Sequence, residues 1–347
     1  MTIMRKVLLA TTALIAVGTV QAASADVTIS GSFEWQYNTF DKSGTDYSSG
    51  TTSDNSITNE IDVNIGFSST TDSGLSLAMG YSLIEGGSAE SVGASIGGDF
   101  GTFGTGFFAE YGDKFATAVD VTADPDSPWT ATSAGAGTIY DTPGDEMVAA
   151  TATGINYLSP DMNGFQFSLG MSNAGRASHA DTTAGGFQYA MTAGDASITL
   201  KYAMSATADS SSGAGNGVDA TSLGLVIGLG DATVTVAQNT AESDNTDQSK
   251  SAGNATVSNA AAFDYKNTGV GVKYTVSDSL SVAAYTASAE NDKDSDYDIS
   301  ENGVSLTYTI ADGLSASVTH TDMDVRLNDQ TTSTSGNYTV VAVNLSF

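Results

Sequence analysis

The chain has 347 residues, with 38 glycines, 4 prolines and no cysteine. Its 11 lysines and arginines face 40 acidic residues, so the formal net charge is −29 at pH 7. This acidic excess argues against nucleic acid as a partner, because phosphate groups would be repelled. The lack of cysteine in the sequence excludes a disulfide framework and a thiolate-bound metal.

Residues 1–25 have the three parts of a secretory signal peptide. The basic pair Arg5-Lys6 precedes an apolar run at 7–20, and small residues at 23–25 form a cleavage site before Asp26. A membrane-spanning helix needs about 20 apolar residues, so this run is short for a retained anchor. The sequence therefore predicts an exported protein with a cleaved signal peptide at 1–25 and one mature domain at 26–347.

The mature chain is built from short runs in which apolar and polar residues alternate. In residues 27–40, Phe33 and Trp35 fall on one face, whereas Glu34 and Gln36 fall on the other. This period of two is typical of a β-strand. The same pattern predicts sixteen strands, near 27–40, 57–68, 74–84, 89–98, 101–109, 148–158, 164–173, 184–193, 196–205, 218–229, 232–241, 268–277, 280–289, 299–310, 314–324 and 337–347.

The connections between these strands alternate between short turns and longer polar loops. Short connections such as 194–195 and 230–231 alternate along the chain with loops such as 41–56 and 242–267. In an up-and-down sheet this rhythm places all turns at one end, and an even strand number closes the sheet into a barrel. The prediction is an all-β, 16-stranded antiparallel transmembrane β-barrel. A soluble β-sandwich gives no reason for such a rhythm.

The two strand faces have different expected surroundings. With the apolar face toward lipid, the polar face lines an interior that sixteen strands leave open to water. The predicted charged residues of this lumen wall are Glu34, Glu60, Asp62, Lys201 and Lys273. Aromatic residues near the turns and the C-terminus predict a girdle at one membrane interface, although aromatics favour strands in general; they are Phe67, Tyr157, Phe165, Tyr274, Tyr308 and Phe347.

The longest connection, 110–147, holds three of the four prolines. It also has more charged residues than any other connection. Loops of this length are usually functional or disordered. One interpretation is a disordered acidic outer loop, and the other is a loop that folds into the lumen and narrows it. The residues of the predicted constriction are Asp113, Lys114, Asp120, Asp124, Asp126, Asp141, Asp145 and Glu146.

Two stretches carry a family resemblance: Ser-Thr-Thr-Asp-Ser-Gly-Leu at 69–75 and Ala-Ser-Ile-Gly-Gly-Asp-Phe-Gly-Thr-Phe-Gly-Thr-Gly at 94–106. With the loop layout and the terminal Phe347, they make the chain similar to general porins of the alphaproteobacterial, Rhodobacter type. The resemblance implies a homotrimeric outer-membrane diffusion pore of a Gram-negative bacterium, with the third external loop folded inward. It also implies that Phe347 is an assembly signal, and that the partners are small hydrophilic solutes, ions and lipid.

One departure from this family pattern bears on selectivity. Such porins set loop acids against a cluster of arginines on the wall, but here Arg176 and Arg326 are the arginines that follow the signal, and both fall in or beside loops. The basic half of the constriction is therefore expected to be thin or absent. The sequence predicts a pore that prefers cations.

Other functions have weaker support. His179 falls in a loop and His320 in a strand, neither in a recognisable catalytic context, so no enzyme is expected and no cofactor is required. Calcium is predicted at an acidic outer loop, although a solvated acidic loop explains the same residues; they are Asp292, Asp294, Asp296 and Asp298. The alternative from another class is a secreted or surface-layer adhesion protein, which fits the charge and the signal but not the loop rhythm.

Overall fold

The computed structural model describes the strands, the short turns and part of the longest loop. The described residues are 26–43, 55–84, 89–106, 111–122, 148, 154–172, 181–208, 217–243, 250–252, 255–257, 263–292, 294–326 and 334–347. Among them, no helix is long and apolar enough to cross a membrane. The predicted signal peptide at 1–25 lies outside the described residues, and the first strand begins at Asp26.

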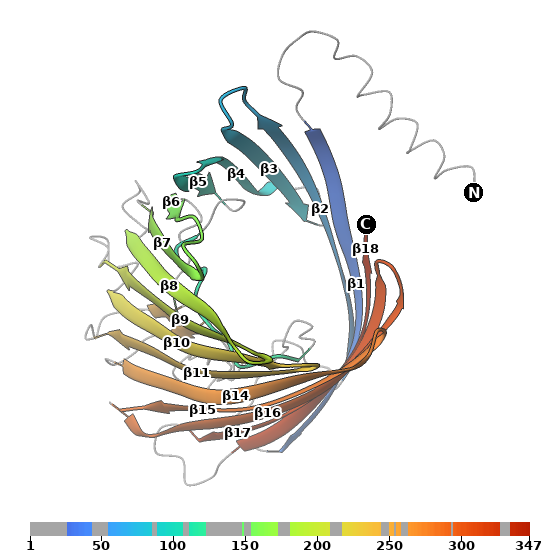
Figure 1. The fold of residues 1–347 in the computed structure, drawn as a ribbon. Coiled ribbons are helices and arrows are strands. Elements are labelled where there is room, and N and C mark those ends of the chain that lie inside the picture. Colours follow the sequence, from blue (N-terminus) through green and yellow to red (C-terminus); the bar gives the residue numbers. More distant parts are fainter. Residues whose placement is uncertain are drawn as a thin grey trace.

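Sixteen strands form one closed antiparallel barrel (Figure 1). Each strand is hydrogen-bonded to the barrel strands before and after it in the chain, and the first strand pairs with the last. They are β1 (Asp26–Ser43), β2 (Asn55–Thr70), β3 (Ser76–Ile84), β4 (Ala89–Gly98), β5 (Gly101–Gly106), β6 (Ile155–Leu158), β7 (Phe165–Ser172), β8 (Thr182–Ala193), β9 (Ala196–Thr207), β10 (Val218–Leu229), β11 (Ala232–Ser243), β14 (Phe263–Ser277), β15 (Leu280–Asn291), β16 (Asp294–Ala311), β17 (Leu314–Arg326) and β18 (Thr334–Ser346). The predicted fold class and strand number are confirmed.

The turn end of the barrel is built from tight hairpins. Ala193 pairs with Ala196 and Leu229 with Ala232, which leaves two residues in each turn. The first of these residues is Gly194 (φ 63°) or Gly230 (φ 60°). A two-residue hairpin turn matches the strand twist only when its backbone takes positive φ, and glycine does so without steric cost.

The barrel closes where the chain ends. β1 and β18 pair from Ser32–Ser346 to Ser43–Ser335, and the backbones of Gly31 and Phe347 exchange two hydrogen bonds of 3.0 and 3.1 Å. A Cβ atom on Gly31 would lie 2.8 Å from the Phe347 ring. The ring therefore lies against the bare backbone of Gly31. In Figure 1 the C-terminus lies beside β1.

The outer face of the barrel is apolar. Large apolar side chains with a third to two thirds of their surface exposed recur on it, including Ile57, Met79, Leu169, Leu223, Val304 and Leu345. Five of the predicted girdle aromatics are exposed there: Phe67, Phe165, Tyr274, Tyr308 and Phe347. The sixth, Tyr157, is half-buried, with its ring centroid 4.6 Å from that of Phe103. A closed barrel with such a face leaves no backbone group unpaired toward lipid.

Several strands are longer at the loop end than the sequence indicates. β14 starts at Phe263 rather than 268, and β16 at Asp294 rather than 299. The extra residues are polar on the outer face as well, as with Lys266 and Asp298, so the period of two is lost there. The prediction that Asp292, Asp294, Asp296 and Asp298 all lie in an outer loop is therefore wrong: Asn291 pairs with Asp294 next to a bulge, and the acidic residues from Asp294 onward belong to β16. β12 (Lys250–Ala252) and β13 (Ala255–Val257) form a separate hairpin that was not predicted.

Candidate pore lumen

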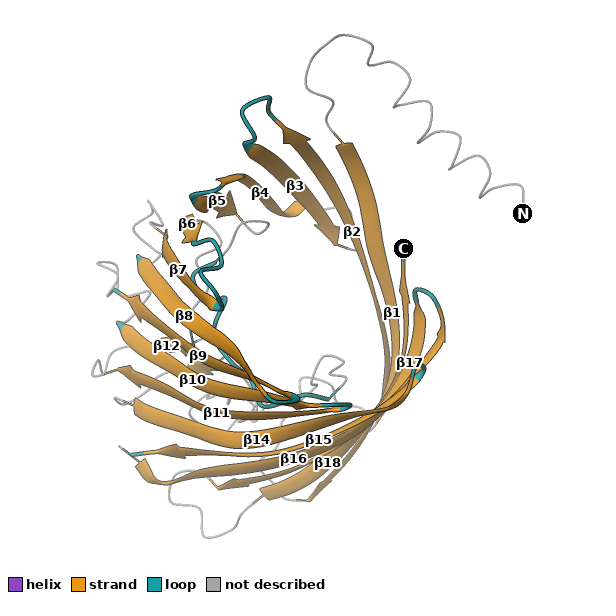
Figure 2. Ribbon diagram, viewed as in Figure 1, coloured by secondary structure: helices purple, strands orange, loops and turns teal. Residues whose placement is uncertain are grey.

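The described part of the predicted constriction loop, residues 111–122, crosses the inner wall of the barrel. It passes inside the ring of strands as the teal segment in Figure 2. Phe115 packs against Val148 and Ala203 of β9, and both Phe115 and Val119 are about 1% exposed. Val119 packs in a second cluster with Ala237 of β11 and with Tyr285 and Ala287 of β15. The segment thus spans the wall from β9 to β15.

Two buried hydrogen bonds hold the backbone of Thr117 to the wall. The Thr117 N–H donates to Ser222 Oγ on β10 (2.9 Å), and Asn239 Nδ2 on β11 donates to the Thr117 carbonyl (3.1 Å). Further along, Asp120 Oδ1 accepts from the Thr122 N–H (2.7 Å) and hydroxyl (2.5 Å). Backbone groups taken out of water must be paired, and these polar wall residues supply the partners.

Inward-facing glycines make the room in which this segment lies. A Cβ atom on Gly224 of β10 would be 2.2 Å from Thr117 Oγ1. On β14, a Cβ atom on Gly269 would be 2.5 Å from Val119 Cγ2, and one on Gly271 would be 2.2 Å from the Val119 carbonyl. Any larger residue at these positions would push the segment off the wall. We refer to Gly224, Gly269 and Gly271 as the glycine groove.

Acidic side chains line one side of the lumen. Glu34 of β1 pairs in register with Glu60 of β2, and both share the face that carries the buried Gln36. Gln36 Nε2 also donates a hydrogen bond to Glu34 Oε1. Asp62 follows on the same face of β2 and is half-buried.

A further acidic residue, Glu301 of β16, was not among the predicted lumen residues. It is fully buried beside Tyr285, and Asp120 of the inward segment lies close enough to interact with that tyrosine. Glu301 shares its strand face with Ser305 and Thr307, and this alternation was readable in the sequence. Because Glu301 follows the acidic run at 292–298 so closely, the sequence alone groups it with the outer loop.

The lysines of the inner wall lie on other strands than Glu34, Glu60 and Asp62. Lys201 of β9 faces inward opposite Gly224, and Lys114 of the inward segment lies close to it. From β1 to β9 the closed order runs β18, β17, β16, β15, β14, β11, β10, β9, which is eight steps of a sixteen-strand circle. Strand β9, which carries Lys201, therefore lies across the barrel from β1, which carries Glu34. Lys273 faces inward on β14, between the two.

Some of the remaining predicted constriction residues lie in the described part of the chain, and the others do not. Asp113 is half-buried at the start of the inward segment, where its carbonyl accepts from the Ala116 N–H at 2.7 Å. Burial raises the pKa of the neighbouring Tyr111 hydroxyl, which keeps that group neutral. Five predicted constriction residues lie outside the described residues: Asp124, Asp126, Asp141, Asp145 and Glu146.

The predicted calcium ligands are not gathered into a metal site in the part of the chain that the structure describes. Asp292 and Asp298 are both exposed, and Asp294 and Asp296 lie in the first residues of β16. Among the described residues, no group of three or more acidic or histidine side chains is arranged to hold a metal ion. Calcium binding stays a prediction.

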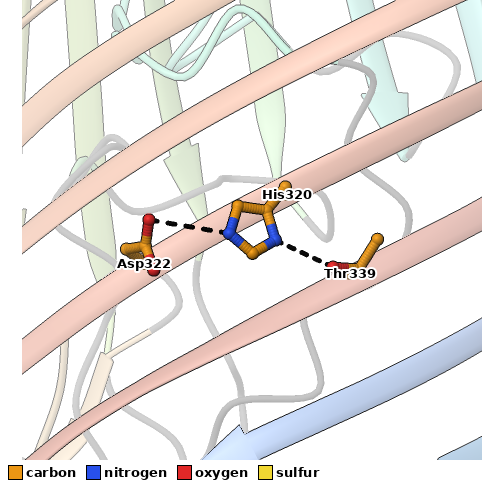
Figure 3. A network of polar contacts seen from close by, with 3 residues as sticks. All are labelled: His320, Asp322 and Thr339. Carbon is orange, nitrogen blue, oxygen red and sulfur yellow. Dashed lines mark hydrogen bonds and ion pairs between the residues drawn. The ribbon is translucent and has the colours of Figure 1, made fainter.

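One histidine lies in a polar network on the outer face (Figure 3). His320 Nδ1 is 2.8 Å from Thr339 Oγ1 on the next strand, and His320 Nε2 is 3.6 Å from Asp322 Oδ2. An acid, an imidazole and a hydroxyl in sequence resemble a nucleophile and its base. The 3.6 Å separation is too long for the hydrogen bond that orients such a base, however. His179 lies outside the described residues.

Two cavities lie on opposite faces of the barrel wall. A groove of about 580 Å³ lies over β6–β10, and its exposed side chains, such as Ile155, Leu169 and Met204, belong to the outer face. A smaller cavity of about 230 Å³ lies on the inner wall of β14–β18. Of the two, only the smaller one belongs to the pore.

The family of the chain is decided by comparison with known proteins. A family model described as Gram-negative porin matches residues 10–345. The chain belongs to the Gram-negative porin family. This membership agrees with the closed barrel and the polar lumen, and it indicates an outer-membrane transport channel rather than an enzyme. It argues equally against an adhesion protein. Curated protein sequences gave no significant match.

Solved structures of this porin fold are similar over nearly the whole chain. A loop L8 deletion mutant of OmpT, an outer membrane protein of Vibrio cholerae, matches with a TM-score of 0.63 at 15% identity, covering 93% of this chain and 99% of that chain. A trimer form of OmpT matches at 0.59 and 14%, covering 93% and 99%. A mutant of Rh. blastica porin matches at 0.55 and 16%, covering 93% and 100%. Such identities establish the fold alone, and an alphaproteobacterial origin stays a prediction.

Proposed function

We propose that this porin forms a water-filled pore for the passive diffusion of small hydrophilic solutes and ions, with a preference for cations. The observation that carries the proposal is the combination of a closed barrel with a polar lumen and a peptide segment lying across its inner wall. A sixteen-stranded barrel is too wide for its own side chains to fill. A segment held inside it reduces the open cross-section.

The proposed constriction is formed by the loop 110–147. Its first part is anchored through Thr117 and Val119, as described above, and brings Asp113, Lys114 and Asp120 onto the inner wall. The other acidic residues of the loop add negative charge to the same region of the chain. We therefore assign the size limit of the pore to this loop.

The cation preference rests on charge. Glu34, Glu60, Asp62, Asp120 and Glu301 face the lumen or lie on the inward segment, whereas the basic groups described there are Lys114, Lys201 and Lys273. A cleft lined mainly by one sign of charge concentrates counter-ions of the opposite sign. The net charge of −29 adds to this potential.

In the outer membrane, the proposed working form is a homotrimer, with the turn end and both mature chain ends toward the periplasm. The trimer form of OmpT supports this assembly by similarity of fold. The predicted lipid contact is the apolar outer face with its aromatic residues. Export by the signal peptide at 1–25 precedes assembly in this account.

The reversal potential across a KCl gradient tests the selectivity. The wild-type pore should prefer K⁺, and the double variant Glu34→Gln, Glu60→Gln should lose part of that preference. The matched control is Glu242→Gln, since Glu242 is exposed on the outer face of β11. Anion preference in the wild-type pore would contradict the proposal, as would equal shifts in the double variant and the control.

A further inference from the structure

The smaller of the two cavities described above lies on the inner wall, toward the turn end. Four neighbouring strands, β14 to β17, supply Lys273, Ser281, Thr307 and Ser315, and β18 supplies Asn344. Val121, at the end of the inward segment, lines it as well. The cavity has about 230 Å³, less than the roughly 300–1,000 Å³ of pockets for drug-sized ligands. It therefore suits a small solute.

Seven of the nine residues that line this cavity have side chains that can donate hydrogen bonds, and the other two are Val121 and Ala283. Ser281 pairs across strands with Thr307, and Thr307 pairs with Ser317, so three hydroxyls lie in one row. Ser315 pairs with Asn344 in the next row. Hydroxyl groups donate or accept, and the asparagine amide carries two donor hydrogens. The lining matches a solute that is rich in oxygen atoms.

Lys273 gives the cavity its charge. It is the charged residue of the lining, and its cross-strand neighbours, Thr233 and Ala283, are uncharged. Within the described part of the chain, no ion pair joins Lys273 to an acid, in contrast to Lys266 on the outer face of the same strand, which lies 3.4 Å from Glu290. An ammonium group among hydroxyl donors is a complement to an anionic oxygen group.

We propose that this cavity binds a small hydroxylated solute through a carboxylate or phosphate group that Lys273 pairs with, while the serine and threonine hydroxyls bind the solute's own hydroxyls. Sugar acids and sugar phosphates share this chemistry. The inference rests on the proposed pore function, because a solute reaches the site only through the lumen. A pore that prefers cations would then bind an organic anion at this one cavity.

The test is the block of ion current by gluconate in planar bilayers. Potassium gluconate should reduce the KCl conductance of the wild-type pore in a saturable way, whereas the uncharged polyol sorbitol should need much higher concentrations. The variant Lys273→Gln should raise the half-saturating gluconate concentration about tenfold or more, since it removes a charge-assisted hydrogen bond. The control Lys266→Gln, on the same strand but the outer face, should bind gluconate like the wild type.

A second variant separates the hydroxyls from the charge. Ser281→Ala with Thr307→Val keeps Lys273 and should weaken gluconate block severalfold at unchanged KCl conductance. Glucose 6-phosphate, tested in the same way, distinguishes a phosphate preference from a carboxylate preference. Non-saturable block, or equal block in Lys273→Gln and wild type, would overturn the site while the pore function stands. An absence of KCl conductance from folded protein would remove both.

Discussion

At the scale of single residues, Gly224 leaves the space that the Thr117 side chain of the inward segment occupies. Overpacking costs about 1–3 kcal/mol, and a change of 1–2 kcal/mol is a factor of about 5–30 in a two-state equilibrium. Because a Cβ atom on Gly224 would collide with Thr117, the variant Gly224→Ala should displace the segment from the wall. We expect a larger single-channel conductance and faster entry of larger sugars in liposome-swelling assays.

The matched control is Gly228→Ala, on the same strand and face. There the nearest atom is Ser197 Oγ at 2.4 Å, at the end of a side chain that can rotate away. Gly228→Ala should therefore leave the conductance unchanged. If both variants behave like the wild type, the glycine groove does not set the position of the segment.

The last residue should matter for assembly rather than for selectivity. Deleting Phe347 removes two backbone hydrogen bonds at the barrel seam and the ring that lies on Gly31. We expect less folded protein, measured as the fraction that shifts in mobility on heating in SDS gels. The pores that still form should keep the wild-type reversal potential. Normal assembly with altered selectivity would show that Phe347 acts in the lumen.

At the scale of elements, the segment 111–122 is held by two polar anchors. Ser222→Ala with Asn239→Ala removes both hydrogen bonds to Thr117, each worth about 1 kcal/mol. We expect a looser segment, seen as greater open-channel current noise and a raised size limit. Thr240→Ala is the control, because its hydroxyl bonds Thr221 on the other face, 2.7 Å away. Noise that rises equally in the control would assign it to the barrel and not to the segment.

The predicted calcium site is also tested at this scale. If Asp292, Asp294, Asp296 and Asp298 bind calcium, a chelator should lower the temperature at which the folded form is lost. Asp296→Asn with Asp298→Asn should abolish that dependence. A folded form equally stable with calcium and with chelator would leave these residues as a solvated acidic edge.

The sequence predicted the strands well because each of them has an apolar face toward the outside of the barrel and a more polar face toward the lumen. All sixteen predicted strands correspond to strands of the barrel, from β1 to β18. The prediction failed where that contrast ends, as at the first residues of β14 and β16, which are polar on the outer face. The hairpin of β12 and β13 was missed for a related reason, since three-residue strands are too short to show a period.

The site was less accessible to sequence reasoning than the fold. Glu34, Glu60 and Lys201 could be placed on the inner face by parity alone. That Gly224 and Gly269 receive the inward segment depends on contacts between residues more than 100 positions apart. The proximity of Asp120 and of Glu301 to Tyr285 likewise appears only after folding.

At the scale of the whole molecule, the chain has the features of a membrane channel. Its closed barrel, apolar outer face and polar lumen agree with its family, and its charges determine which ions it concentrates. Three such barrels in one trimer should act as three parallel pores.

Single-channel recording in planar bilayers tests this claim most directly. Purified folded protein, added to a bilayer in KCl, should produce conductance steps, with the three pores of one trimer seen as steps of equal size. Boiled protein is the control and should give none. Folded protein that shows the heat-modifiable mobility of an intact barrel, but never conducts, would contradict the account.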